Sequence, residues 1–161
     1  MLIKLLLVFA VQAYRNIPAF RRRLPLELLI STAFSNNQHL EILQAAHDWN
    51  QAAGVELFHM GTSYDTDVIP ELVETGGGTY IRALYNGNGQ WRVKNSTTWL
   101  STRLTDAALY NVALHELGHT LGLDHALESS VMSYVLVLRP DGTAPSVDRL
   151  SITADDIAGL S

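Results

Sequence analysis

The sequence predicts an α+β domain in which one sheet is combined with a few helices. Three observations support this fold class. The chain has 161 residues, which suits one compact domain and is short for two. Its hydrophobic fraction of 47% is sufficient to form a buried core. Strand-like and helix-like stretches follow in the order strand, helix, strands, helix, loop and helix.

The N-terminal half predicts two strands around a helix. Residues 24–32 are apolar and end in Ser and Thr, and residues 55–60 form a second short apolar stretch, so both indicate strands. Residues 37–53 have helical spacing, and Gly54 stands where a C-terminal cap belongs. The apolar positions on one face of that helix are Ile42, Ala45, Ala46, Trp49, Ala52 and Ala53. Residues 64–67 predict a turn rather than a calcium site.

The central stretch predicts a β-hairpin. Residues 76–78 are three glycines and indicate a loop. Residues 79–85 and 90–94 then predict two strands, closed by the Asn-Gly-Asn-Gly turn of residues 86–89.

Two helices are expected in the C-terminal half. The first runs from Thr105 or Asp106 to Leu121, and Gly122 ends it. Its core face includes Leu109, Val112 and Ala113. The second begins near Thr153, whose Thr-x-x-Asp pattern is a variant of the capping box.

Charge and composition exclude several functional classes. The net charge of −5 and pI of about 5.6 argue against a nucleic-acid partner. There is no cysteine, so any metal must be held by His, Asp, Glu or Tyr. The longest apolar run, at the N-terminus, is too short to span a bilayer, and we therefore expect no membrane anchor.

The first residues predict a secretory signal peptide over residues 1–13. A basic residue precedes the apolar run of residues 5–11, and Ala13 provides the small residue that a signal peptidase requires. A buried N-terminal strand or helix is the alternative. The three arginines of residues 21–23 indicate a solvated strand entry. Whether they are instead a processing site that would make residues 14–23 a removed propeptide stays open.

A metal-binding motif begins at His115, where the chain reads H-E-L-G-H-T-L-G-L-D-H. His115 and His119 are four residues apart, so a helix places both imidazoles on one face. Gly122 permits a left-handed turn that returns His125 as a third ligand. Three nitrogen ligands leave a fourth position open, which is typical of a catalytic zinc site. Glu116 is placed to take a proton from a zinc-bound water.

The complete H-E-x-x-H-x-x-G-x-x-H pattern is far more specific than H-E-x-x-H alone. Met132 follows seven residues after His125, in Ser-Val-Met-Ser-Tyr. On these residues the chain resembles the metzincin metallopeptidases, and most closely their matrixin group. The resemblance is strongest over residues 109–132 and 150–160, which are similar to the active-site helix and the last helix of matrixins.

The resemblance implies a metzincin-like twisted mixed sheet with an active-site helix and a small C-terminal subdomain. We expect residues 14–161 to form one catalytic domain, with an upper part at about 24–122 and a lower part at about 123–161. Met132 would form the Met-turn under one bound zinc ion. An extended peptide would lie along an edge strand, for which residues 79–85 are the candidate.

The function implied is that of a secreted, monomeric zinc endopeptidase acting on extended polypeptides. Glu116 would accept the proton of the zinc-bound water and pass it to the leaving amine. The alternative is a catalytically silent zinc-binding interaction module, against which the intact Glu116 counts. The apolar residues 135–138 predict a preference for a hydrophobic residue on the carboxyl side of the cleaved bond.

The chain also departs from matrixins. Ala126 replaces the usual Ser or Thr, and Met-Ser-Tyr resembles serralysins. Tyr134 lies at the offset where serralysin-like and astacin-like enzymes place a tyrosine that reaches zinc. It would cap the zinc or bind the oxyanion, or it would pack in the lower part. A structural zinc is doubtful, because the candidates His59, Asp65 and Asp67 have no second His nearby. Structural calcium has no support.

Overall fold

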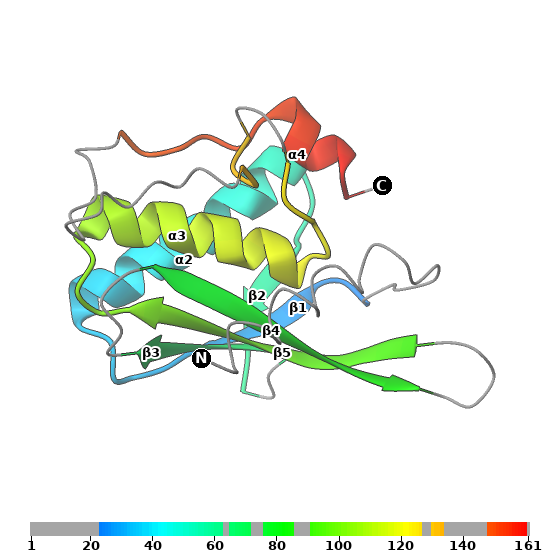
Figure 1. Cartoon of the computed structure of the whole chain (residues 1–161), viewed down its shortest axis with the longest axis horizontal. Coiled ribbons are helices and arrows are strands. Elements are labelled where there is room, and N and C mark those ends of the chain that lie inside the picture. The colour runs from blue at the N-terminus through cyan, green and yellow to red at the C-terminus, as the bar shows by residue number, and fades with distance from the viewer. Residues whose placement is uncertain are drawn as a thin grey trace.

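A computed structural model describes residues 23–62, 65–71, 76–85, 91–126, 130–133 and 148–160. Figure 1 shows a sheet with two helices across one of its faces. The strands are β1 (Leu26–Ile30), β2 (Phe58–Met60), β3 (Thr66–Glu71), β4 (Gly77–Tyr85) and β5 (Trp91–Ser101). The helices are α2 (Asn36–Ala53), α3 (Asp106–Thr120) and α4 (Ala154–Ala158).

The sheet is mixed and has five strands in the order β2-β1-β3-β5-β4. The pairs β1–β2, β1–β3 and β3–β5 are parallel, and β4 is antiparallel to β5. This arrangement confirms the expected α+β class with a mixed sheet. It also leaves β4 at one edge of the described sheet, beside the helix that carries the histidine motif.

Helix α2 ends at the predicted Gly54 cap and begins at Asn36, one residue before the predicted start. Ser35 caps its N-terminus, because the Ser35 hydroxyl accepts from Gln38 N while the Gln38 side chain accepts from Ser35 N. Gly54 ends the helix with φ of 68°, in the left-handed region that favours glycine. Trp49 is fully buried against α3, and its Nε1 donates to Leu114 O at 2.8 Å. This bond satisfies the one polar group of the indole and fixes α2 against α3.

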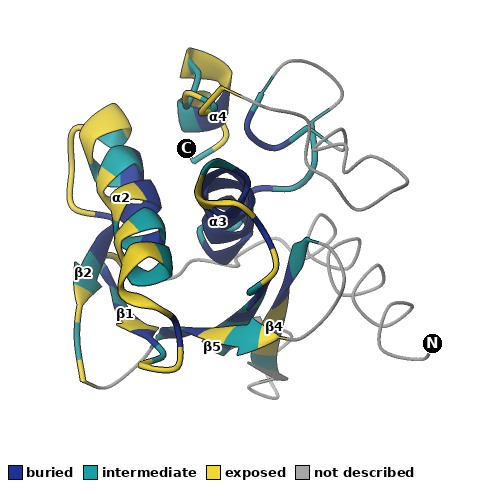
Figure 2. Ribbon diagram, turned by 90° about the vertical axis from the view of Figure 1, so that its left-hand side faces the viewer, coloured by how far each residue is buried: buried dark blue, intermediate teal, exposed yellow. Residues whose placement is uncertain are grey.

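Helix α3 lies at the centre of the molecule. Thr105 caps its start, and its residues from Ala108 to Thr120 are all buried. Figure 2 shows the reason, since α3 has the sheet below it, α2 beside it and α4 above it. Gly122 follows with φ of 101° and turns the chain sharply away, as expected. The motif therefore lies on a helix that packs against the sheet, α2 and α4.

Three expectations for local structure were wrong. Residues 64–67 do not form only a turn, because Thr66 and Asp67 belong to β3. Thr66 and Val68 face the core and alternate with the partly or fully exposed Asp67 and Ile69, which is a strand pattern. Residues 76–78 are not only a loop, because β4 begins at Gly77.

The third correction concerns Ala52, which is exposed. The contact face of α2 follows the spacing of Ile42, Ala46, Trp49 and Ala53, and Ala52 lies beside this line. The turn expected at residues 86–89 lies outside the described residues.

The last described segment is tied to the two long helices. Asn111 on α3 donates from Nδ2 to Asp148 O and accepts from Leu150 N at 2.8 Å. Arg149 pairs with Glu41 on α2 and lies over the ring of Tyr110 at 4.6 Å from its centroid. These contacts carry the chain to α4, which Thr153 and Asp156 cap as predicted. No helix within the described ranges is long and apolar enough to cross a membrane.

Candidate metal centre

Three imidazoles converge at the C-terminal end of α3. His115 and His119 come from the helix, one turn apart, and His125 comes from the loop that Gly122 starts. The Nε2 atom of His115 lies 3.1 Å from that of His119 and 3.2 Å from that of His125. The Nε2 atoms of His119 and His125 are 3.2 Å apart. The structure thus brings together all three residues that the motif predicted as metal ligands.

Hydrogen bonds at Nδ1 orient two of these rings. His115 Nδ1 lies 2.8 Å from Val131 O, and His119 Nδ1 lies 2.8 Å from Leu123 O. A carbonyl oxygen only accepts, so each Nδ1 carries the proton and each Nε2 presents its lone pair to the common point. Burial lowers the pKa of His115 to about 4 and the pKa of His119 to about 3, which keeps both rings neutral at pH 7.

This donor set fits a tetrahedral zinc ion. Zinc binds imidazole nitrogen at roughly 2.0–2.1 Å, so two tetrahedral nitrogen ligands should be about 3.3 Å apart. The observed separations of 3.1–3.2 Å are close to that value. The two Nε2 lone pairs of His115 and His119 at this spacing repel each other unless a cation or a proton lies between them. Across the described residues, no other His, Asp or Glu side chains form such a group.

Glu116 lies beside the histidines, where sequence reasoning placed it. Its side chain is 8% exposed, and its Oε2 accepts from the Thr79 hydroxyl at 2.8 Å. Burial raises the pKa of Glu116 to about 7, and the bond from Thr79 acts in the opposite direction. A carboxyl with a pKa near neutrality can both accept and release a proton under ordinary conditions. Sequence reasoning missed Thr79, because nothing in residues 76–85 indicates which side chain faces α3.

Met132 packs under the histidines and is 2% exposed. A Cβ built on Gly118 would lie 2.4 Å from Met132 Sδ, so the glycine leaves the space that this side chain fills. The Met132 carbonyl accepts from Ala126 N at 2.8 Å, directly after His125. Gly122 and Met132 therefore lie where the motif placed them, next to the third histidine.

Asp156 supports this turn through Val131, and sequence reasoning placed it only at the start of the last helix. Its Oδ2 accepts from Val131 N at 3.4 Å and from Thr153 N at 2.8 Å. Burial alone would raise the pKa of Asp156, but the hydrogen bonds from Thr153 and Val131 outweigh it and hold the pKa below its usual value. The residue is 4% exposed and is ionised at neutral pH.

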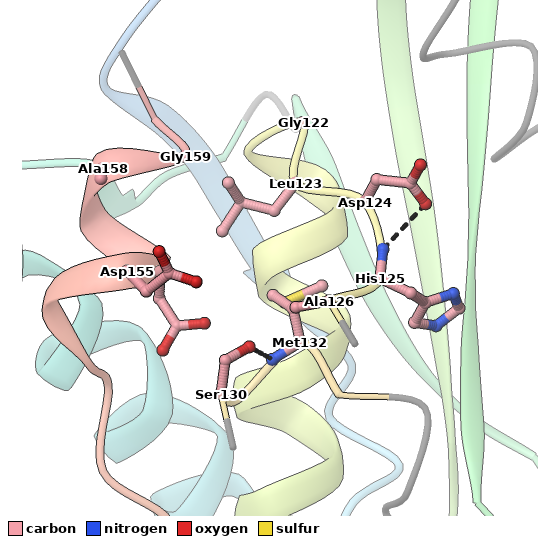
Figure 3. Close-up of a pocket in the computed structure, with 11 residues that line it drawn as sticks. Gly122, Leu123, Asp124, His125, Ala126, Ser130, Met132, Asp155, Ala158 and Gly159 are labelled. Atoms are coloured by element: carbon pink, nitrogen blue, oxygen red, sulfur yellow. Dashed lines mark hydrogen bonds between the residues drawn. The ribbon is translucent and has the colours of Figure 1, made fainter. Parts of the chain in front are cut away.

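A cavity of about 510 Å³ lies between the loop after α3 and helix α4. Figure 3 shows Asp155 on one side of it and Leu123, Ser130 and Met132 on the other. The imidazole of His125 points away from the α4 side. His125 nevertheless lines this cavity, so the cavity adjoins the histidine centre on the α4 side.

The remaining predicted residues do not join the centre. His59 Nε2 lies 3.6 Å from Glu27 Oε1, on the outer face of the sheet. Asp65 accepts from Glu27 N, and Asp67 accepts from the Thr97 hydroxyl. His59, Asp65 and Asp67 form no metal-holding group in the part of the chain that is described. Tyr134 and residues 135–138 lie outside the described residues.

Comparison with known proteins identifies the family. The family model for matrixin matches residues 26–161. The chain belongs to the matrixin family. The family implies zinc, and the histidine triad that would hold it is present in this matrixin.

Three curated relatives are similar to this matrixin over part of their length. The hatching enzyme of Paracentrotus lividus is 26% identical over 82% of the chain and 23% of its own length. The metalloendoproteinase 1-MMP of Arabidopsis thaliana is 29% identical over 52% of the chain and 23% of its own length. The matrix metalloproteinase-A of Caenorhabditis elegans is 29% identical over 56% of the chain and 20% of its own length. The chain thus spans about a quarter or less of the length of these relatives.

Proposed function

We propose that this matrixin domain is a zinc-dependent endopeptidase that hydrolyses extended polypeptides. One observation carries the proposal: three neutral imidazole nitrogens converge at zinc-binding distances beside a buried carboxyl group with a pKa near 7. Neither half would suffice alone. The histidines could hold a metal without any reaction, and a buried glutamate without a metal has no activated water to act on.

The roles follow from the groups that each residue offers. His115, His119 and His125 would hold the zinc ion. When bound, zinc supplies a Lewis acid that acidifies a water molecule and polarises a substrate carbonyl. Glu116 would take the proton of that water and deliver it to the leaving amine. Gly122 would set the direction in which His125 returns, and Met132 would pack beneath the imidazoles.

The substrate class is argued from strand β4. Among the described strands it pairs with β5 alone, so its other edge would be able to pair with an extended peptide by strand addition. Thr79 on β4 contacts Glu116, so a peptide on that edge would pass close to the proposed base. One relative is named a metalloendoproteinase, which favours cleavage within chains over removal of terminal residues.

The wider assignments are also proposals. We propose one catalytic domain at residues 14–161, with parts at about 24–122 and 123–161, that acts as a secreted monomer after removal of residues 1–13. The link from Asn111 to residues 148–150 supports treating both parts as one unit. Tyr134 stays a prediction as an oxyanion donor or zinc cap, and Tyr134→Phe with zinc content and turnover measured would decide it.

The test compares two isosteric variants. Glu116→Gln removes the proposed base, and Glu56→Gln is the matched control, because Glu56 is exposed and remote in sequence from the motif. We expect the parent chain and both variants to bind stoichiometric zinc by metal analysis. Cleavage of a quenched peptide library should fall by about a hundredfold or more in Glu116→Gln only, the scale of lost general-base catalysis. A chelator should abolish cleavage by the parent.

Two results would contradict the proposal. Stoichiometric zinc without any cleavage by the parent chain would indicate a silent zinc-binding module. Parent-like turnover in Glu116→Gln would assign the proton transfer to another group.

A further inference from the structure

A hydroxyl group on the edge strand contacts the proposed base. Thr79 on β4 is 3% exposed, and its Oγ1 lies 2.8 Å from Glu116 Oε2 and 3.1 Å from Glu116 O. Thr79 and Glu116 are 37 residues apart in sequence, so this contact exists only because β4 packs on α3. At this contact β4, the strand along which the substrate is proposed to lie, meets Glu116, the proposed base.

The direction of the hydrogen bonds is set by the neighbouring strand. Thr79 pairs directly with Thr98 on β5, and their hydroxyl oxygens are 3.0 Å apart. The Thr79 hydroxyl donates to Glu116, whose Oε2 and carbonyl oxygen are the acceptors within reach. The Thr98 hydroxyl then donates to Thr79. Each hydroxyl thus has one defined role, and the arrangement resists rotation of Thr79 away from Glu116.

A glycine two residues earlier brings the strand close enough. A Cβ built on Gly77 would lie 2.8 Å from Val112 Cγ1 on α3, so only a residue without a side chain permits this approach. Gly77 and Thr79 lie on one face of β4, about 6.7 Å apart. Val112 and Glu116 are one helical turn apart on α3, about 6 Å. The two spacings match, so the close approach at Gly77 places the short Thr79 side chain within reach of Glu116.

The contact uses one of the two oxygens of the Glu116 carboxylate. Within the part of the chain that the structure describes, Glu116 Oε2 accepts from Thr79, whereas Oε1 has no hydrogen-bond partner. A hydrogen bond to one oxygen fixes the plane of the carboxylate. The second oxygen is then held in a defined direction and remains available to a proton from elsewhere.

We propose that Thr79 is a positioning residue, which holds Glu116 Oε2 so that Oε1 is presented to the proton that the carboxylate must take. This inference rests on the proposed role of Glu116 in peptide hydrolysis. The Thr79 hydroxyl would act through Glu116, which it contacts. Its loss should therefore impair turnover while substrate binding and zinc content are retained.

The first experiment separates the hydroxyl from the shape of the side chain. In the zinc-loaded full-length chain, Thr79→Val keeps the shape and removes the hydroxyl, and Thr79→Ser keeps the hydroxyl. We expect Thr79→Val to lower kcat by about 10- to 100-fold, the scale of one lost hydrogen bond to a charged group. KM should change less than about twofold, and Thr79→Ser should recover kcat to within about threefold of the parent.

The matched control is Thr66→Val. Thr66 is also a fully buried strand threonine with a hydroxyl contact to a neighbouring strand residue, Ser96, but it lies on β3, away from Glu116. It should leave kcat within about twofold of the parent, because loss of a buried hydroxyl elsewhere affects stability and not turnover. Parent-like kcat in Thr79→Val would overturn the proposal, as would failure of Thr79→Ser to recover it.

The second experiment does not depend on activity. A double-mutant cycle of Thr79→Val and Glu116→Leu is measured by urea unfolding of the zinc-loaded chain at fixed free zinc. The unfolding equilibrium constants should be non-additive by at least about threefold, as for residues in direct contact. Additive effects would overturn the contact itself. Clear coupling in a chain that cleaves no peptide would instead leave the contact standing and refute the proposed endopeptidase function.

Discussion

Gly118→Ala tests how tightly Met132 and Trp49 pack against α3 beside the proposed metal centre. The added Cβ would lie 2.4 Å from Met132 Sδ and 3.1 Å from Cζ2 of Trp49. Both neighbours are buried, since Met132 is 2% exposed and Trp49 is 0% exposed. The methyl group therefore enters a filled space between α3, α2 and the Met-turn.

The expected loss can be worked from these distances. Heavy atoms are most stable at about 3.5–4.0 Å, so the methyl group overlaps the sulfur by more than about 1 Å. Overpacking of this kind costs about 1–3 kcal/mol. Alanine is about 1 kcal/mol more favourable than glycine inside a helix, which offsets part of that cost. The net effect should be a loss of about 1 kcal/mol in the free energy of unfolding.

The displacement should also reach the histidines. The Met132 carbonyl accepts from Ala126 N, so movement of Met132 shifts the residue that follows His125. Displacing groups that orient metal ligands typically costs about 10- to 100-fold in affinity, and we expect a loss at the lower end of this range. Zinc affinity is measured by competition with a coloured chelator, and stability by urea unfolding.

A second variant provides the control for this prediction. Met132→Ala creates the space that the new methyl group needs, so the double variant should be more stable than the sum of the two single effects indicates. If Gly118→Ala is instead about 1 kcal/mol more stable than the parent, with unchanged zinc affinity, only helix propensity acts and the packing argument is wrong.

Two further predictions test other parts of the same framework. Asp156→Asn should lower the free energy of unfolding by about 1–3 kcal/mol at pH 7. The folded pKa of Asp156 is depressed, so this difference from the parent should shrink as pH falls below about 4, when unfolding by urea is followed from pH 7 to 3. Gly77→Ala should cost about 1–3 kcal/mol by the same measurement, because its Cβ would lie 2.8 Å from both Trp99 O and Val112 Cγ1.

The histidine centre could be predicted because its geometry is local. His115 and His119 share a helical face through the helix period alone, and Gly122 is the residue that a sharp exit requires. The 11-residue stretch from His115 to His125 therefore contains nearly all the information that brings the three rings together. The capping box at Thr153 is local in the same sense and was predicted from the sequence.

The parts that escaped prediction depend on partners distant in sequence. Asp67 is typical of a turn by composition, yet β3 forms there because β1 and β5 lie on either side and accept its backbone hydrogen bonds. Gly77 and Gly78 indicate a loop when the sequence is considered alone. In the fold, α3 and the Trp99 ring occupy the space where side chains at these two positions would lie. Thr79 has no distinguishing feature in the sequence. Its hydroxyl lies next to Glu116 because β4 packs on α3.

The segment after residue 147 shows how a region without any metal ligand can control the metal centre. Both backbone polar groups of Val131 are hydrogen-bonded. Its N–H donates to Asp156 on α4, and its carbonyl accepts from Nδ1 of His115. That second bond selects the tautomer of His115 whose Nε2 is free for a metal. Asp156 is in turn placed by the anchoring of residues 148–150 on Asn111. The orientation of the first proposed ligand therefore depends on contacts more than 30 residues further along the chain.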